Sequence, residues 1–128
     1  MISIAGDILN KIKSMNEQSE QITMQIENDQ QANGWKNKRG TCEKDYCSCG
    51  CCKDHWLNFS NQEWPDQCSV VGCNNRATDG AHMYNSNESM REWIVPTCHK
   101  CNTTYDTELP LKNGITLVSA NKSITCEK

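Results

Sequence analysis

The chain has 128 residues, of which 36% are hydrophobic and only one is phenylalanine, so it supports one small domain with a modest core and an appendage. Its formal charge of −3 excludes a general electrostatic attraction to nucleic acids. No stretch approaches the roughly 20 apolar residues of a membrane helix, and no secretory signal is visible. We therefore expect a cytoplasmic, reducing compartment, in which the ten cysteines bind metal rather than form disulfides.

The N-terminal segment, residues 1–33, follows a heptad pattern. Residues 3–31 contain one glycine and no proline, and Asn33-Gly34 is a typical helix end. The pattern predicts a long coiled-coil helix that self-associates through residues 5–31 into a homo-oligomer; docking on the chain's own zinc domain and binding of a foreign protein are the alternatives. The seam positions alternate in steps of three and four: Ala5, Ile8, Ile12, Met15, Ser19, Ile22 and Ile26.

Residues 34–63 form a hinge and a cysteine-rich segment. Lys36, Lys38 and Arg39 lie beside Trp35, a combination that can contact nucleic acid but is more typical of a solvated linker.

The cysteine-rich part of this segment predicts a second zinc site. The C-x-C-G turn offers Cys47 and Cys49, His55 begins an expected short helix, and Cys126 supplies a fourth ligand from the C-terminus. Such a site would connect the end of the chain to its middle. Three cysteines remain over, and any of them can replace one of the four ligands: Cys42, Cys51 and Cys52.

The strongest motif lies in the C-terminal segment, residues 64–128. Cys68 and Cys73 form one close pair, and Cys98 and Cys101 form another. Gly72 provides the backbone freedom that a metal-binding knuckle needs, and Thr97 is a candidate helix cap. Four thiolates from two tight turns satisfy a closed, structural zinc site. The motif predicts zinc here, which with the second site makes two ions per chain; disulfides or buried thiols are the alternative.

The residues around these cysteines resemble a known superfamily. C-S-V-V-G-C-N-N-R-A-T-D-G-A-H followed by W-I-V-P-T-C-H-K-C-N resembles the HNH (His-Me finger, treble-clef) superfamily. Over residues 64–120 it is also similar to the zinc core of phage endonuclease VII-type resolving enzymes and to small HNH-like proteins of phages and bacteria. The resemblance implies a small α+β zinc-stabilised domain. It further implies that His82 activates water as general base and that Asn102 helps hold a catalytic Mg²⁺ or Mn²⁺.

The sequence departs from the active members of this superfamily. Ala81 occupies the position of their metal-binding acid, with Asp79 and Glu88 as displaced substitutes. The second histidine of the pattern is missing, and His99 between the cysteines is expected to face solvent. Residues 64–128 carry six Lys and Arg against seven Asp and Glu, so they offer no basic surface. We therefore expect a module that binds another macromolecule; a DNA or RNA nuclease is the alternative.

The remaining apolar residues of this segment predict its core. Residues 115–120 read as a strand beside residues 93–95. Tyr84, Trp93 and Tyr105 are expected to surround the metal.

Overall fold

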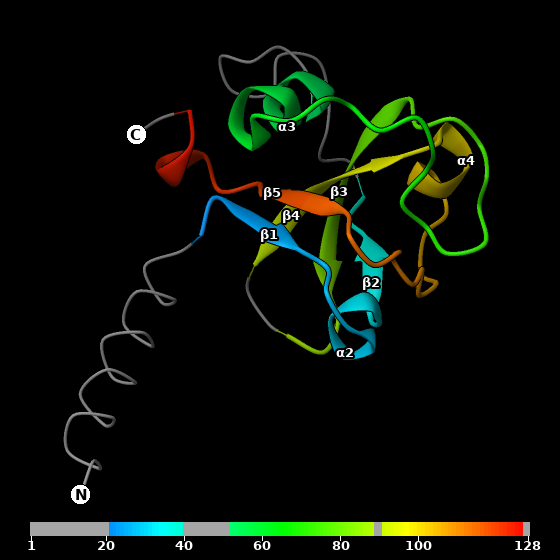
Figure 1. The fold of residues 1–128 in the computed structure, drawn as a ribbon. Helices are drawn as coiled ribbons and strands as arrows, with labels where there is room; N and C mark the ends of the chain where they lie inside the picture. The colour runs from blue at the N-terminus through cyan, green and yellow to red at the C-terminus, as the bar shows by residue number, and fades with distance from the viewer. Residues whose placement is uncertain (1–20, 40–51, 89–90, 127–128) are drawn as a thin grey trace, which may run out of the picture.

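One antiparallel sheet organises the residues that this computed structural model describes, which are 21–39, 52–88 and 91–126. The five strands lie in the order β1-β5-β4-β3-β2 (Figure 1). Short helices connect and cover them. The strands are β1 (Thr23–Gln25), β2 (Trp35–Asn37), β3 (Asp79–Asn85), β4 (Glu92–Thr97) and β5 (Thr116–Ser119); the helices are α2 (Asp29–Ala32), α3 (Cys52–Ser60), α4 (His99–Asn102) and the 3₁₀ helix η1 (Lys122–Ile124).

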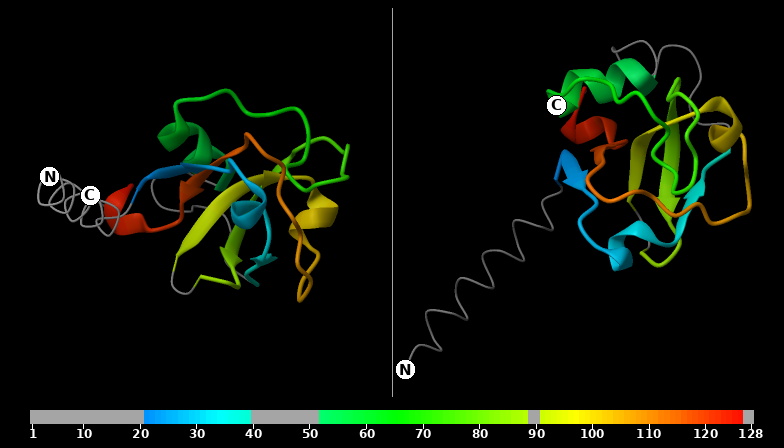
Figure 2. Two further views of the ribbon diagram at one scale, coloured as in Figure 1. Left: turned by 60° about the horizontal axis from the view of Figure 1, so that its bottom comes forward. Right: turned by 45° about the vertical axis from the view of Figure 1, so that its right-hand side comes forward.

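The hairpin of β3 and β4 is the centre of the sheet. Its register runs from Asp79 opposite Thr97 to Tyr84 opposite Glu92. Strand β5 pairs with the outer side of β4, as the sequence predicts, and β1 closes that edge. The end of the described chain lies beside its beginning, because η1 is next to the start of β1 in Figure 1 and in both views of Figure 2.

Both faces of the sheet are covered, but by different parts of the chain. Because side chains alternate along a strand, Ala81 and Met83 lie on one face and His82 on the other. The first face packs with the cysteine pairs and is called the cysteine face. The second packs with α3 through Ile94 and Val118 and is called the helix face. No helix of the described ranges has the length and hydropathy to cross a membrane.

Helix α3 approaches the sheet at a glycine. A Cβ atom on Gly80 would lie 2.7 Å from the backbone carbonyl carbon of Cys52 and 2.7 Å from the amide nitrogen of Lys53. The helix backbone therefore rests directly on β3. Trp56 anchors the same helix to β5, because its indole N–H donates to the carbonyl oxygen of Thr116 over 2.9 Å.

The predicted coiled-coil helix is wrong over residues 21–31. This part of the chain forms β1, a turn and α2 instead, and Asn28 caps α2 by accepting a hydrogen bond from the amide of Gln31. Ile26 is fully buried on the cysteine face, where its amide donates to the carbonyl oxygen of Ile115 over 3.0 Å. The last seam residue thus belongs to the core of its own chain. Residues 1–20 lie outside the described residues, so self-association stays a prediction.

The aromatic residues also differ in part from expectation. Trp93 is buried, as predicted, whereas Tyr84 and Tyr105 are partly exposed. Tyr105 lies under the guanidinium group of Arg39, 4.2 Å from its carbon to the ring centre. Trp35, expected in a hinge, is buried in β2 and donates its indole N–H to the carbonyl oxygen of Gln31.

Replacing Ile26 with Ala should destabilise the monomer. Truncating a fully buried isoleucine removes apolar contact and leaves a cavity, which costs about 2–5 kcal/mol of unfolding free energy. Chemical denaturation at two protein concentrations measures it. A cost that appears only at the higher concentration would place Ile26 at an interface between copies instead.

Replacing Gly80 with Ala should be more harmful than replacing Gly114 with Ala. The first change forces α3 away from β3, at a cost of about 1–3 kcal/mol. Gly114 has a φ of +87° but open space around it, so its replacement costs about 1 kcal/mol of backbone strain. Thermal unfolding of the two variants compares them directly. Equal losses would show that α3 can shift without cost.

Candidate metal centre

The loop before β3 presents the first two cysteines. The amide of Cys73 donates to the carbonyl oxygen of Val70 over 3.0 Å, which closes a tight turn around Gly72 at a φ of +80°. The amide of Cys68 donates to the carbonyl oxygen of Asn75 over 2.8 Å. The backbone thus turns both thiols to the same side, as the C-x₄-C spacing predicts.

The end of β4 presents the other two cysteines. Cys98 is itself the N-cap of α4, and its Sγ accepts a hydrogen bond of 3.4 Å from the amide of Cys101. The predicted cap at Thr97 is therefore wrong: that residue is the last of β4 and is fully buried. A single helical turn brings both thiols to the N-terminal end of α4.

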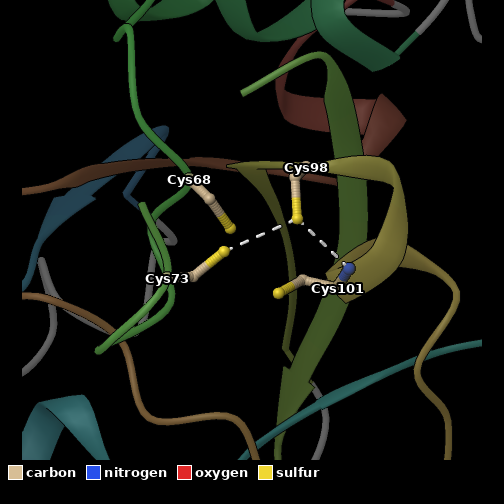
Figure 3. A group of neighbouring side chains, drawn as sticks. All are labelled: Cys68, Cys73, Cys98 and Cys101. Carbon is tan, nitrogen blue, oxygen red and sulfur yellow. Dashed lines mark hydrogen bonds between the residues drawn. The ribbon is translucent and has the colours of Figure 1, made fainter. Parts of the chain in front are cut away.

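The four thiols converge on one point (Figure 3). All four Sγ atoms lie within 4.8 Å of one another, and none of the four cysteines is in a disulfide. Cys73 Sγ and Cys98 Sγ are 3.7 Å apart. A tetrahedral ion with Zn–S distances of about 2.3 Å requires thiolates roughly 3.8 Å apart. The donor set and its spacing fit zinc. Within the described part of the chain, no other group of His, Cys, Asp or Glu is arranged to hold a metal.

The thiols differ in how readily they ionise. Burial raises the pKa of Cys68 and, together with the hydrogen bond to Cys98, that of Cys101. Burial acts in the same direction on Cys98, but hydrogen bonds from the amide of Cys101 and from Asn75 Nδ2 outweigh it and lower the pKa to about 7. A bound cation would take the place of the protons on the other thiols.

His82 lies across the sheet from this cluster, on the helix face. Its Nε2 is 2.6 Å from Glu92 Oε1, and Glu92 Oε2 is 2.6 Å from Lys38 Nζ. Burial lowers the pKa of His82, although the contact with Glu92 opposes this. Burial disfavours ionisation of Glu92 as well, but its hydrogen bonds to Lys38 and His82 lower its pKa overall.

Asn102, the last residue of α4, belongs to a different group of side chains near the surface. Its Nδ2 donates to Asp79 Oδ2 over 3.0 Å, and His99 Nδ1 is 2.8 Å from the same oxygen. Burial disfavours ionisation of Asp79, but these hydrogen bonds outweigh it and lower the pKa of its carboxyl group. His99 faces solvent, as predicted. His82 and Asn102 therefore have separate partners, and the structure does not join them in one site.

The second zinc site stays a prediction. Cys47 and Cys49 lie outside the described residues. His55 is fully buried in α3, where its Nε2 donates to the carbonyl oxygen of Ser119 over 2.9 Å. Cys126 is disulfide-bonded, and so is Cys52. A disulfide sulfur is no thiolate ligand, so zinc at this position requires Cys126 to be reduced.

Three contacts of these groups were not foreseen from the sequence. Asn75 donates to Cys98 Sγ over 3.8 Å, Lys112 Nζ donates to the carbonyl oxygen of Cys73 over 2.8 Å, and Glu92 contacts His82. Only the contact between Glu92 and His82 could have been predicted from the sequence. A hairpin with its turn near residue 88 places Glu92 diagonally across from His82, whereas the other two contacts depend on loop paths without periodicity.

The fold and the cluster together define a small antiparallel-sheet module with a four-cysteine candidate zinc centre. Beyond this class, no protein-family model, no curated protein and no solved structure matches the chain. No comparison therefore identifies the HNH superfamily. The expected fold, an HNH-like treble clef with a long N-terminal coiled-coil helix, is wrong: the described residues form a five-stranded antiparallel sheet with short helices.

Removing the metal should unfold the cysteine face. Binding energy at a structural zinc site is folding energy, so Cys98→Ser should lose bound zinc and lower the melting temperature by more than about 10 °C. Elemental analysis under reductant and thermal unfolding measure the two effects.

Cys126→Ser is the matched control for that experiment. It should keep the ion of the four-cysteine centre, because Cys126 lies outside this cluster. Loss of one of two ions from Cys126→Ser would instead establish the second site. A Cys98→Ser protein that keeps its full zinc content would exclude the first.

Proposed function

We propose that this chain is a zinc-stabilised module that acts by binding another macromolecule, and that this macromolecule is a protein. The convergence of four thiols within 4.8 Å carries the proposal. Four thiolates complete a tetrahedral shell and leave no open position for water or substrate. Such an ion stabilises the fold and takes no part in a reaction.

The surroundings of the expected catalytic residues support a binding role rather than a nuclease. His82 contacts Glu92, while Asn102 contacts Asp79 in a different group. Ala81 is fully buried in the core of the cysteine face. An acid at that position would not reach a surface metal, because its carboxylate would be buried among apolar side chains.

Charge and aromatic placement favour a protein partner over nucleic acid. Lys38 contacts Glu92, and Arg39 contacts Asp106 over 3.0 Å, so both cations already have acidic neighbours. Trp35, the aromatic residue of this cluster, is 2% exposed and offers no stacking surface to a base. With a formal charge of −3, the chain has no general electrostatic attraction to phosphate groups.

A nuclease assay tests this proposal most directly. The zinc-loaded chain should neither retain nor cleave duplex DNA, branched DNA or RNA with Mg²⁺ or Mn²⁺ at roughly physiological salt. Gel retention and end-labelled cleavage measure the two activities. Cleavage that disappears in both His82→Ala and Asn102→Ala, while zinc content is unchanged, would overturn the proposal in favour of a nuclease.

A further inference from the structure

A small pocket opens between the segment after α3 and the turn before β5. Its volume is about 140 Å³. Trp56 and Pro96 line it from α3 and β4, and Pro65 and Ile115 line it from the two connecting segments. Glu63 is the acidic residue among its lining residues. Trp56 and Pro96 are buried, whereas Glu63 is exposed. The pocket therefore combines an apolar interior with an acidic residue at the surface.

The interior of this pocket is preformed. The indole N–H of Trp56 is already used in its hydrogen bond to Thr116, and the ring of Trp64 packs edge-on against it at 5.3 Å between centres. Trp56 thus offers an occupant only apolar and π surface. This excludes ligands that need a hydrogen-bond donor from the indole.

The charge of Glu63 indicates which kind of side chain fits this pocket. Within the described ranges Glu63 has no ion pair, and the nearby cation Lys53 lies over the ring of Trp64, 5.0 Å from its centre. A lysine or arginine side chain matches such a pocket, because its apolar stem can contact the walls while its charged end reaches a carboxylate. An acidic side chain would be repelled, and an aliphatic one would gain no ion pair with the carboxylate. The negative formal charge of the chain favours the same choice.

We propose that this pocket binds a lysine or arginine side chain of the protein partner, presented on a basic segment. The inference rests on the proposed function, because it names the kind of protein that the module binds. The pocket lies on the helix face, where Pro96 and Thr116 are found, and not on the cysteine face that holds the metal centre.

Peptide titration of the full, zinc-loaded chain tests this assignment. The probes are a capped glycine pentapeptide with one central lysine, its arginine counterpart, and the same peptide with norleucine. The indole N–H resonance of Trp56 reports occupancy by NMR. We expect a saturable shift with either basic peptide and an affinity at least fivefold weaker, or no shift, with norleucine.

Two protein variants complete the test. Glu63→Gln should weaken binding of the basic peptides about fivefold, the upper range for an exposed ion pair. Glu27→Gln, which removes an exposed acid outside the pocket, should bind as the unchanged chain does. Equal binding by Glu63→Gln, equal binding of norleucine, or no shift with either basic peptide would each overturn the pocket assignment.

The outcomes separate this assignment from the proposed function. Loss of peptide binding with intact zinc and no cleavage of nucleic acid would overturn the pocket alone. Nuclease activity together with normal peptide binding would overturn the protein-binding role and leave the pocket as a site for basic side chains.

Discussion

The meeting of four thiols beside the end of β4 is the constraint on which the rest of the molecule depends. The segment between α3 and β3, residues 61–78, has no strand of its own. It is connected to its surroundings by an isolated bridge between Val70 and Leu111 and by backbone hydrogen bonds such as those from Ser69 to Pro96 and from Val71 to Pro110. It nevertheless covers part of the cysteine face. Small domains bury little apolar surface, so a loop segment of this kind gains stability from an added cross-link. The four thiols bring this segment together with β4 and α4, so an ion bound by them would be such a cross-link.

The same centre organises the helix face through the backbone of β4. The amide of Ser69, next to the first cysteine, donates to the carbonyl oxygen of Pro96 over 3.0 Å. Pro96 pairs with Gly80, the residue on which α3 rests. Three consecutive contacts therefore connect the loop of Cys68 and Cys73 to α3: Ser69 with Pro96, Pro96 with Gly80, and Gly80 with the helix backbone.

The metal centre could be predicted from the sequence, whereas the prediction of a coiled-coil helix at the N-terminus was wrong over residues 21–31. The two patterns differ in how specific they are. Cysteine pairs at tight-turn spacing have few uses, so their ligand role could be inferred before the loop path was known. Apolar residues at steps of three and four are less specific. Ile26 fits the heptad spacing, but it lies in the connection between β1 and α2, where it is buried in the core of its own chain. Its agreement with the heptad is a coincidence. Asn28 carried the contrary signal, since a good N-cap in mid-pattern favours a helix that starts there. The partner of Asn102 depends on where α4 lies beside β3, and residue spacing alone does not determine that placement.

The two faces of the sheet carry different sites: the cysteine face holds the candidate metal centre, and the helix face holds the pocket. The cysteine face is closed by thiols, tryptophans and aliphatic residues, and its charged neighbours Asp79 and His99 contact each other. The helix face keeps a pocket whose apolar wall, Pro96, precedes Cys98 by two residues. The hydrogen bond from the Ser69 amide to the Pro96 carbonyl oxygen connects this wall of the pocket to the loop that carries Cys68 and Cys73. Under the proposed function, an ion bound by the four thiols would therefore also hold the end of the strand that lines the pocket.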